Sequence, residues 1–305
     1  MRHFLALSDF TPEELSKILT LATQLKEEWL RGGNPPRLES KVLAMVFQKP
    51  SLRTRVSFDM AMRHLGGDAL FLSPAEIGLG KREAISDISR VLSGYVDAIM
   101  ARVFSHDHVL ELAEYASVPV INGLSDFNHP CQAMADALTM IEHFNRLEGL
   151  SLSYIGDGNN VAVSLLFLSA LMGMDFALAS PEGYEIPEDI VAEAISLAKE
   201  SGASIHQTTD PYEAVENASV IYTDTWTSMG QEEEIEKRRK VFPPYQVNDQ
   251  LLSAANHNAI VLHCLPAHRG EEITDEVADG PQSAIFQQAE NRMHAQKAIL
   301  VHLLT

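Results

Sequence analysis

The chain has 305 residues, of which 46% are apolar and 21% charged, and its formal net charge is −19. This composition is typical of a globular protein with room for two domains of about 150 residues each. The acidic balance argues against broad contact with nucleic acid or an anionic membrane, because both require a basic surface. Nowhere do about 18 apolar residues follow one another, so no membrane span is predicted. A protein this acidic can bind a phosphorylated ligand only by concentrating its few cations locally.

The cysteines and the N-terminal segment indicate the compartment. Residues 1–7 carry a short apolar patch without the small-residue cleavage site of an export signal. Cys131 and Cys264 are too few for a disulfide framework and suit a reducing compartment. We therefore expect a cytoplasmic protein. Each cysteine is expected to be either a small buried apolar residue or a thiol in a functional site.

The chain opens with a predicted helix and continues as alternating strands and helices. Thr11, Pro12 and Glu14 form a capping box with proline at the first helical position. Short apolar runs, typical of buried parallel strands, then alternate with helical stretches. The predicted strands are 42–47, 69–72, 98–102 and 118–121 in the first half and, after a helix at about 130–143, 151–155, 175–179, 219–223 and 259–262 in the second.

This repeated alternation predicts an α/β protein with two domains, each a parallel sheet flanked by helices. A last helix, at about 283–303, could pack on either half. Ligands of parallel sheets bind outside the carboxyl ends of the strands. The residues that follow each strand are therefore the candidates for function.

The segment Lys-Pro-Ser-Leu-Arg-Thr-Arg at 49–55 follows the first strand and leads into a helix. It places Ser51, Arg53 and Thr54 at the helix N-terminus, where free N–H groups and the helix dipole favour anions. An arginine adds a bidentate donor for phosphate oxygens. A capped helix with solvated arginines is an equally good interpretation of this segment alone.

Further donors follow other strands of the first half. Arg102 stands at the end of one strand, and His129-Pro130-Cys131-Gln132 follows another and opens a helix. Proline fits the first helical position, so His129 and Gln132 are expected near open N–H groups. A single histidine is more often structural than catalytic. Three strand ends that supply phosphate donors nevertheless predict an anion site.

In the second half, Gly-Asp-Gly-Asn-Asn at 156–160 ends one strand and starts a helix. The third glycine of a dinucleotide turn is missing, which argues against a nucleotide cofactor. Asp224 follows the next strand and precedes a polar segment at 227–234, for which a solvated loop is the plain interpretation. His263-Cys264-Leu265-Pro266 follows the last strand.

Taken together, six segments resemble the aspartate/ornithine carbamoyltransferase family. They are Ser-x-Arg-Thr-Arg, HPCQ, GDGNN, TDTW with SMGQEEE, HCLPAHRGEE and ENRMHAQKAIL, and they extend from about residue 43 to 301. The last four resemble the ornithine branch of the family. The resemblance implies transfer of the carbamoyl group of carbamoyl phosphate to the side-chain amine of ornithine, giving citrulline, without cofactor or metal. Arginine metabolism, with biosynthesis as the expected direction, follows from this.

The resemblance also implies roles for individual residues. Carbamoyl phosphate would be bound by Ser51, Leu52, Arg53, Thr54, Arg102, His129, Gln132, Cys264, Leu265 and Arg292. Ornithine would be bound by Asn160, Asp224, Ser228 and Met229, and the catalytic residues would be Arg102, His129, Asp224 and Cys264. The amine proton would leave through Asp224 and Cys264 or to the phosphate itself, and the sequence leaves both routes open.

Two positions depart from the family pattern. Leu52 stands where threonine is commonest, which is tolerable if its backbone N–H contacts phosphate. Gly78 stands where the family often has a polar side chain that reaches a neighbouring subunit, and we expect Lys81 to compensate.

By resemblance, residues 1–140 form the carbamoyl phosphate domain, with 285–305 packing back on it, and 150–284 form the ornithine domain. The family forms trimers with sites between subunits, so a homotrimer or a multiple of trimers, with shared active sites, is expected. Aspartate, N-acetylornithine or succinylornithine, and putrescine are alternative acceptors, and a binding module without catalysis is a further alternative. The residue Asp224 and the Ser-Met-Gly segment favour ornithine.

Overall fold

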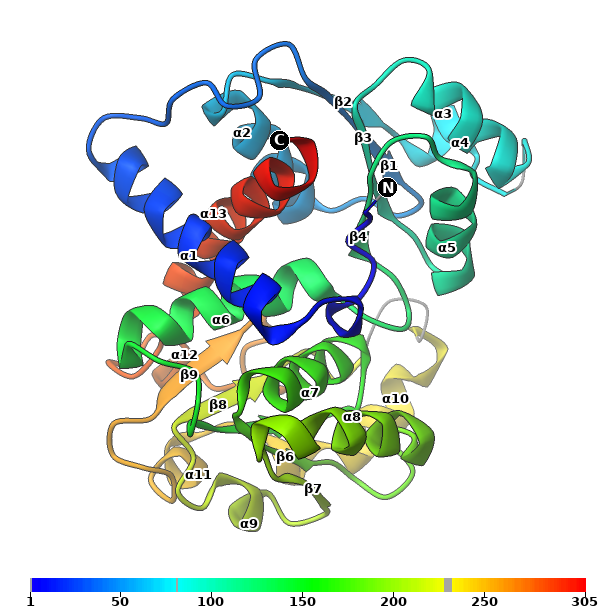
Figure 1. The fold of residues 1–305 in the computed structure, drawn as a ribbon. Coiled ribbons are helices and arrows are strands. Elements are labelled where there is room, and N and C mark those ends of the chain that lie inside the picture. Colours follow the sequence, from blue (N-terminus) through cyan, green and yellow to red (C-terminus); the bar gives the residue numbers. More distant parts are fainter. Residues whose placement is uncertain (1, 81, 228–231) are drawn as a thin grey trace. The chain divides into compact units, whose positions relative to one another are not determined.

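The computed structural model describes residues 2–80, 82–227 and 232–305. The chain divides into two compact units, Met1–Leu138 with Glu290–Thr305 (unit 1) and Thr139–Ala289 (unit 2). Each unit contains one parallel sheet with helices around it (Figure 1). The predicted fold class is thereby confirmed. No described helix combines the length and the apolar character that a membrane crossing requires.

Unit 1 is built on a four-stranded sheet in the order β2-β1-β3-β4. Its strands are β1 (Val42–Phe47), β2 (Asp68–Leu72), β3 (Ala98–Arg102) and β4 (Val120–Leu124), all parallel. Its helices are η1 (Leu7–Asp9), α1 (Pro12–Leu30), α2 (Leu52–His64), α3 (Pro74–Ile77), α4 (Ile85–Ser93), α5 (His106–Tyr115) and the larger part of α6 (Pro130–Phe144). The central strands β1 and β3 are buried almost throughout, as their apolar runs predict.

Unit 2 is built on a five-stranded sheet in the order β7-β6-β5-β8-β9. Its strands are β5 (Ser151–Ile155), β6 (Asp175–Ala179), β7 (Ile205–Thr208), β8 (Val220–Thr223) and β9 (Ile260–His263), again all parallel. Its helices are α7 (Asn160–Met172), α8 (Glu188–Ser201), α9 (Pro211–Val215), η2 (Glu232–Glu234), α10 (Ile235–Val241), η3 (Pro243–Tyr245), α11 (Asp249–Leu252) and α12 (Asp275–Ala278). The strand β7 was not predicted, because this half-exposed edge strand has Ile205 as its one apolar residue.

The C-terminal helix α13 (Ile285–Leu304) begins in unit 2 and ends in unit 1. In unit 1 it packs against α1, and Figure 1 shows its red end beside the blue α1. Lys26 Nζ of α1 donates to Asn291 Oδ1 at 2.7 Å. Lys297 Nζ of α13 donates to Asn34 Oδ1, also at 2.7 Å. The predicted return of this helix to the first half of the chain is confirmed.

Packing of α13 in unit 1 buries an unusual set of basic side chains. Lys297 is fully buried, and its Nζ lies 4.7 Å from the centroid of the Trp29 ring. Burial, partly offset by Glu28, lowers the pKa of Lys297 to about 8. Burial and then the charge of Lys297 lower the pKa of His294 to about 3 and that of His64 to about 4. Both imidazoles are therefore neutral in the folded protein.

A neutral buried histidine makes stability depend on pH. The unfolded chain takes up a proton at His294 near pH 6.5, whereas the folded chain does not, so unfolding becomes easier as pH falls below 6.5. Between pH 6.5 and 5 we expect His294 to lower the free energy of unfolding by about 2 kcal/mol. Urea denaturation at the two pH values measures this loss.

The variant His294→Gln should show a loss that is smaller by about this amount, because glutamine does not titrate. His257→Gln, which removes an exposed imidazole, is the matched control. An identical pH dependence in the wild type and in His294→Gln would contradict the assignment.

Candidate active site

The sheet of unit 1 has a topological switch point between β1 and β3. The chain passes from β1 to its neighbour β2 on one side and then returns to β3 and β4 on the other. Ligands of such sheets bind in the crevice outside the carboxyl ends of the two strands at this point. The loop after β1 and the last residue of β3 are therefore the places to look for a site in this unit.

The loop after β1 leads into α2 through a capped N-terminus. Ser51 is the N-cap residue, and its Oγ accepts from the N–H of Thr54 at 3.3 Å. Leu52 and Arg53 form the first turn, where backbone N–H groups have no acceptor within the helix. Leu52 is 75% exposed. Because a leucine side chain has no hydrogen-bond donor, only its backbone N–H could bind an anion. The Arg53 side chain is partly exposed.

The buried hydroxyl of Thr54 contacts side chains from the loop after β1, from β3 and from α13. These residues form the candidate anion half-site of unit 1. Thr54 Oγ1 accepts from Arg102 Nη1 at 3.3 Å and from Arg292 Nη2 at 3.0 Å. The Ser51 hydroxyl donates to the same atom at 3.2 Å. Arg102 comes from the end of β3 and Arg292 from α13, so three separate segments converge here. Two guanidinium groups beside a helix N-terminus form an environment suited to phosphate.

His129, just before α6, interacts with the same two cations, and Gln132 lies in the first turn of this helix. His129 is 4% exposed, and burial followed by the charges of Arg292 and Arg102 lowers its pKa well below 6.5. Its imidazole is therefore neutral. Gln132 is fully buried and donates from Nε2 to Asp136 Oδ1 at 2.8 Å. Among the described residues, the Gln132 Oε1 atom has no hydrogen-bond partner.

The two cysteines lie in different surroundings. Cys131 is buried, and its Sγ donates to the backbone carbonyl of Asn122 at 3.3 Å. Burial raises the pKa of Cys131 to about 12, so it remains a thiol and acts as a small core residue. Cys264 is only partly buried and contacts an acidic side chain in unit 2.

Gly78 is explained by its backbone conformation. It is the C-cap of the short helix α3 with φ 52°, a left-handed conformation that side chains disfavour. A Cβ atom at this position would lie 2.9 Å from the Cβ of Arg82. A polar side chain at residue 78 would therefore be strained in this chain. Lys81, which we expect to compensate, lies outside the described residues.

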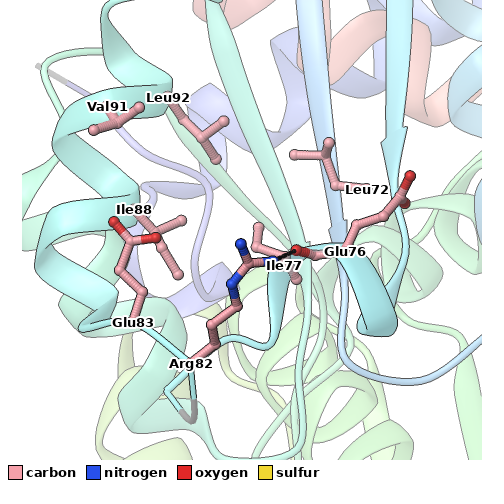
Figure 2. Close-up of a pocket in the computed structure, with 8 residues that line it drawn as sticks. All are labelled: Leu72, Glu76, Ile77, Arg82, Glu83, Ile88, Val91 and Leu92. Atoms are coloured by element: carbon pink, nitrogen blue, oxygen red, sulfur yellow. Dashed lines mark hydrogen bonds between the residues drawn. The ribbon is translucent and has the colours of Figure 1, made fainter.

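A cavity of about 230 Å³ lies elsewhere in unit 1, against β2, α3 and α4. Figure 2 shows its lining residues, which are Leu72, Glu76, Ile77, Arg82, Glu83, Ile88, Val91 and Leu92. Arg82 Nη1 donates to the backbone carbonyl of Glu76 at 3.2 Å. The described residues that line this cavity include none of those that gather around Thr54. The anion half-site is thus separate from it.

The sheet of unit 2 has its own switch point, between β5 and β8. Asp224 follows β8 directly and is 8% exposed. Its Oδ1 accepts from the N–H of Thr225 at 2.8 Å and from the Cys264 thiol at 3.0 Å. Its Oδ2 accepts from Asn159 Nδ2 at 3.0 Å. Three donors from three separate segments thus hold the orientation of this carboxyl group at the switch point.

Leu265 follows Cys264 after β9 and is held in a left-handed backbone conformation, with φ 60°. Its N–H donates to His263 Nδ1 at 2.9 Å, so the His263 proton must lie on Nε2. That nitrogen lies 3.1 Å from Glu272 Oε1, and both side chains are fully buried. Glu272 was not among the predicted site residues. It is the last residue of the segment HCLPAHRGEE, which was the only pattern in the sequence that pointed to it.

Of the remaining predicted ligands, Asn160 lies at the start of the helix that follows β5 at this switch point. Asn160 is the first residue of α7 and is partly exposed, whereas Ser228 and Met229 lie outside the described residues. Burial, opposed by Arg238, raises the pKa of Asp157 to about 6. Arg238 Nη1 lies 2.8 Å from Asp157 Oδ2 and donates to the Trp226 carbonyl at 2.7 Å.

Comparison with known proteins identifies the family. Residues 2–142 match the domain described as "Aspartate/ornithine carbamoyltransferase, carbamoyl-P binding domain". Residues 148–303 match the "Aspartate/ornithine carbamoyltransferase, Asp/Orn binding domain". The chain belongs to the aspartate/ornithine carbamoyltransferase family.

Members of this family with high similarity span nearly the whole chain. The ornithine carbamoyltransferase of Halalkalibacterium halodurans is 56% identical over 303 residues, which cover 99% of this chain and 95% of that protein. The anabolic ornithine carbamoyltransferase of Pyrococcus furiosus is 55% identical over 300 residues, covering 98% and 95%. A solved structure of ornithine carbamoyltransferase from Pyrococcus furiosus matches with a TM-score of 0.96 at 54% identity, covering 99% of this chain and 97% of that one.

The shared hydroxyl of Thr54 gives a test of the half-site in unit 1. Thr54→Val keeps the side-chain shape but removes an acceptor used by the buried guanidinium group of Arg292 and the partly buried one of Arg102. We expect the free energy of unfolding to fall by about 1–3 kcal/mol, as measured by urea denaturation. Thr20→Val is the control, because the Thr20 hydroxyl bonds only along the exposed side of α1, to the Ser16 carbonyl. Equal losses in both variants would contradict this role.

Proposed function

We propose that this chain is an ornithine carbamoyltransferase, which converts carbamoyl phosphate and L-ornithine into L-citrulline and phosphate. The observation that carries the proposal is the Asp224 carboxylate at the switch point of unit 2, fixed by three donors. Within the family, the acceptor is aspartate or ornithine. A fixed carboxylate attracts a cationic amine and repels the second carboxylate of aspartate. The relatives named ornithine carbamoyltransferase support this choice.

We propose that unit 1 binds carbamoyl phosphate. Phosphate would bind to Ser51, Leu52, Arg53 and Thr54 at the N-terminus of α2, together with Arg102 and Arg292. The carbamoyl group would bind to His129 and Gln132. This assignment is supported by the convergence of two guanidinium groups on a helix N-terminus, because dipole and forked donors both favour a dianion.

We propose that unit 2 binds ornithine through Asn160, Asp224, Ser228 and Met229. Cys264 would contact the reacting groups, and the Leu265 carbonyl would accept from the carbamoyl amine. The left-handed conformation of Leu265, held by His263, supports a fixed direction for that carbonyl. The Cys264 thiol donates a hydrogen bond to Asp224 Oδ1, which supports a place for Cys264 beside the acceptor amine.

In the reaction that we propose, the neutral side-chain amine of ornithine attacks the carbamoyl carbon. The new C–N bond forms as the C–O bond to phosphate breaks, and the amine loses one proton. Because an alkylamine has a pKa near 10.4, its neutral form costs about 4 kcal/mol at pH 7.4. Desolvation lowers this cost, whereas ionised Asp224 raises it. The proton leaves through Asp224 and Cys264 or to the departing phosphate.

The activated donor makes a covalent enzyme intermediate unnecessary. Correct placement of two reactants is worth roughly 7–11 kcal/mol, and one well-placed donor to developing negative charge roughly 3–4 kcal/mol. Arg102 and His129 are the proposed donors to the carbamoyl oxygen. The lowered pKa of His129 supports this role, because a neutral imidazole donates a hydrogen bond without giving up its proton.

We also propose a pathway, a compartment and an oligomeric state for the enzyme. The relative named as anabolic supports arginine biosynthesis as the pathway. The free thiols of Cys131 and Cys264 suit the cytoplasm. We propose a homotrimer with active sites shared between subunits. The exposed apolar side chains Leu52 and Val56, one turn apart on α2, support a subunit interface at this helix.

An acceptor panel tests the proposed activity. Purified protein with carbamoyl phosphate should form citrulline from ornithine, while aspartate, N-acetylornithine and putrescine should give carbamoylated product at least about 100-fold more slowly, because a mismatched buried polar group is costly. Product is measured colorimetrically. Preference for another acceptor would overturn the ornithine assignment, and no turnover with any acceptor would indicate a binding module.

A pair of arginine variants tests the donor half-site. Arg53→Ala should lower kcat/KM for carbamoyl phosphate by about 100-fold or more, because a cation at the phosphate is lost. Arg55→Ala is the matched control on the same helix, where the guanidinium lies 4.0 Å from the centroid of the Phe71 ring. Steady-state kinetics and circular dichroism are measured for both. Near-wild-type kinetics in Arg53→Ala would remove this residue from the site.

A further inference from the structure

We propose that Asn159 is a positioning residue, which fixes the orientation of the Asp224 carboxylate toward the acceptor amine. The inference deepens the proposed function and rests on it. Asn159 follows β5 and Asp224 follows β8, the two strands at the switch point of unit 2. The hydrogen bond from Asn159 Nδ2 to Asp224 Oδ2, at 3.0 Å, joins these two loops.

The orientation of the Asn159 amide follows from its surroundings. Asn159 is the N-cap of α7, and its Oδ1 accepts from the N–H groups of Val161 at 2.9 Å and Ala162 at 3.1 Å. Tyr154 donates its hydroxyl to the same oxygen at 3.1 Å. Three donors on one atom identify it as the oxygen of the amide. The NH₂ group must then face Asp224.

Tyr154 helps to hold the Asn159 amide in this orientation. Its side chain is fully buried and stacks on Tyr222, with ring centroids 5.5 Å apart. Burial, and then the negative charge of Asp224, raise the pKa of the Tyr154 hydroxyl well above 10. The hydroxyl therefore keeps its proton and remains a donor to Asn159 at any pH at which the protein works.

Helix capping alone does not require asparagine at this position. An N-cap needs only an acceptor, and aspartate, serine and asparagine are nearly equivalent in that role. An aspartate at 159 would place a second carboxylate against Asp224 Oδ2. The amide is thus required by Asp224 rather than by α7. Because its oxygen caps the helix and its nitrogen binds Asp224, Asn159 differs in role from Asn160, which we assign to substrate.

The Asn159 bond completes the set of contacts that fix the carboxylate. Oδ1 of Asp224 is held by Thr225 and Cys264, and Oδ2 by Asn159. Without the donor on Oδ2, the carboxylate can rotate about its Cβ–Cγ bond. Misorientation of a group that binds the acceptor weakens acceptor binding and transfer, but it leaves binding of the donor unchanged.

The variant Asn159→Asp separates capping from positioning. It retains an acceptor for the N-terminus of α7 and removes the donor to Asp224. We expect the KM for carbamoyl phosphate to stay near its wild-type value, whereas repulsion between the two carboxyl groups lowers the urea midpoint. The kcat/KM for ornithine should fall about tenfold or more, because a hydrogen bond to a charged group is replaced by repulsion.

Asn248→Asp is the matched control, because Asn248 caps α11 through a bond from the Leu251 N–H to its Oδ1 at 3.0 Å. We expect wild-type kinetics in this variant. Tyr154→Phe, which removes only the donor to Asn159, should give a smaller loss confined to ornithine. Unchanged ornithine kinetics in Asn159→Asp, or equal losses for both substrates, would overturn the proposal.

A crystal structure of Asn159→Asp supplies a measurement that does not depend on activity. We expect the Asp224 carboxylate to turn away from residue 159, and an unchanged orientation would overturn the positioning role. Failure of the proposed function is distinct, since the wild type would then form no citrulline from ornithine. If the wild type uses another amine, the same comparison of variants is made with that acceptor.

Discussion

The buried hydroxyl of Thr54 is the contact on which the rest of unit 1 depends. Through it, the guanidinium groups of Arg102 and Arg292 are held together in a protein of formal net charge −19. Like charges held close together repel, and the pKa of His129 is lowered first by burial and then by the same two arginines. A dianion bound there offsets this repulsion. We propose that this offset contributes to the affinity for carbamoyl phosphate.

In both units the candidate functional residues lie at a switch point of the sheet. The residues at this point are basic in unit 1 and acidic in unit 2. In each sheet, one pair of neighbouring strands forms a switch point, β1 with β3 in unit 1 and β5 with β8 in unit 2. Cations gather at the first, and the Asp224 carboxylate stands at the second. Within each sheet, the loops that follow neighbouring parallel strands lie close together, because the carboxyl ends of these strands share one edge. The same rule of topology therefore places cationic side chains at one edge of the sheet in unit 1 and a carboxyl group at one edge of the sheet in unit 2.

The sequence predicted most strands because buried parallel strands are continuous apolar runs, and it missed β7 because an edge strand needs no such run. It could not give the order of strands, which depends on pairing between distant segments. Arg292 was therefore predicted from the family resemblance alone, because no local sequence pattern indicates that a residue of α13 contacts Thr54. Asn159 was missed because two adjacent asparagines look alike until one is seen to cap α7. The roles assigned to the gathered residues remain predictions.

A crystal structure of the protein with carbamoyl phosphate tests the central claim most directly. The account predicts that the phosphate lies at the N-terminus of α2, within hydrogen-bond distance of Arg102 and Arg292, with its carbamoyl group toward His129. Binding in the cavity lined by Arg82 and Ile88, or at any place away from Thr54, would contradict it.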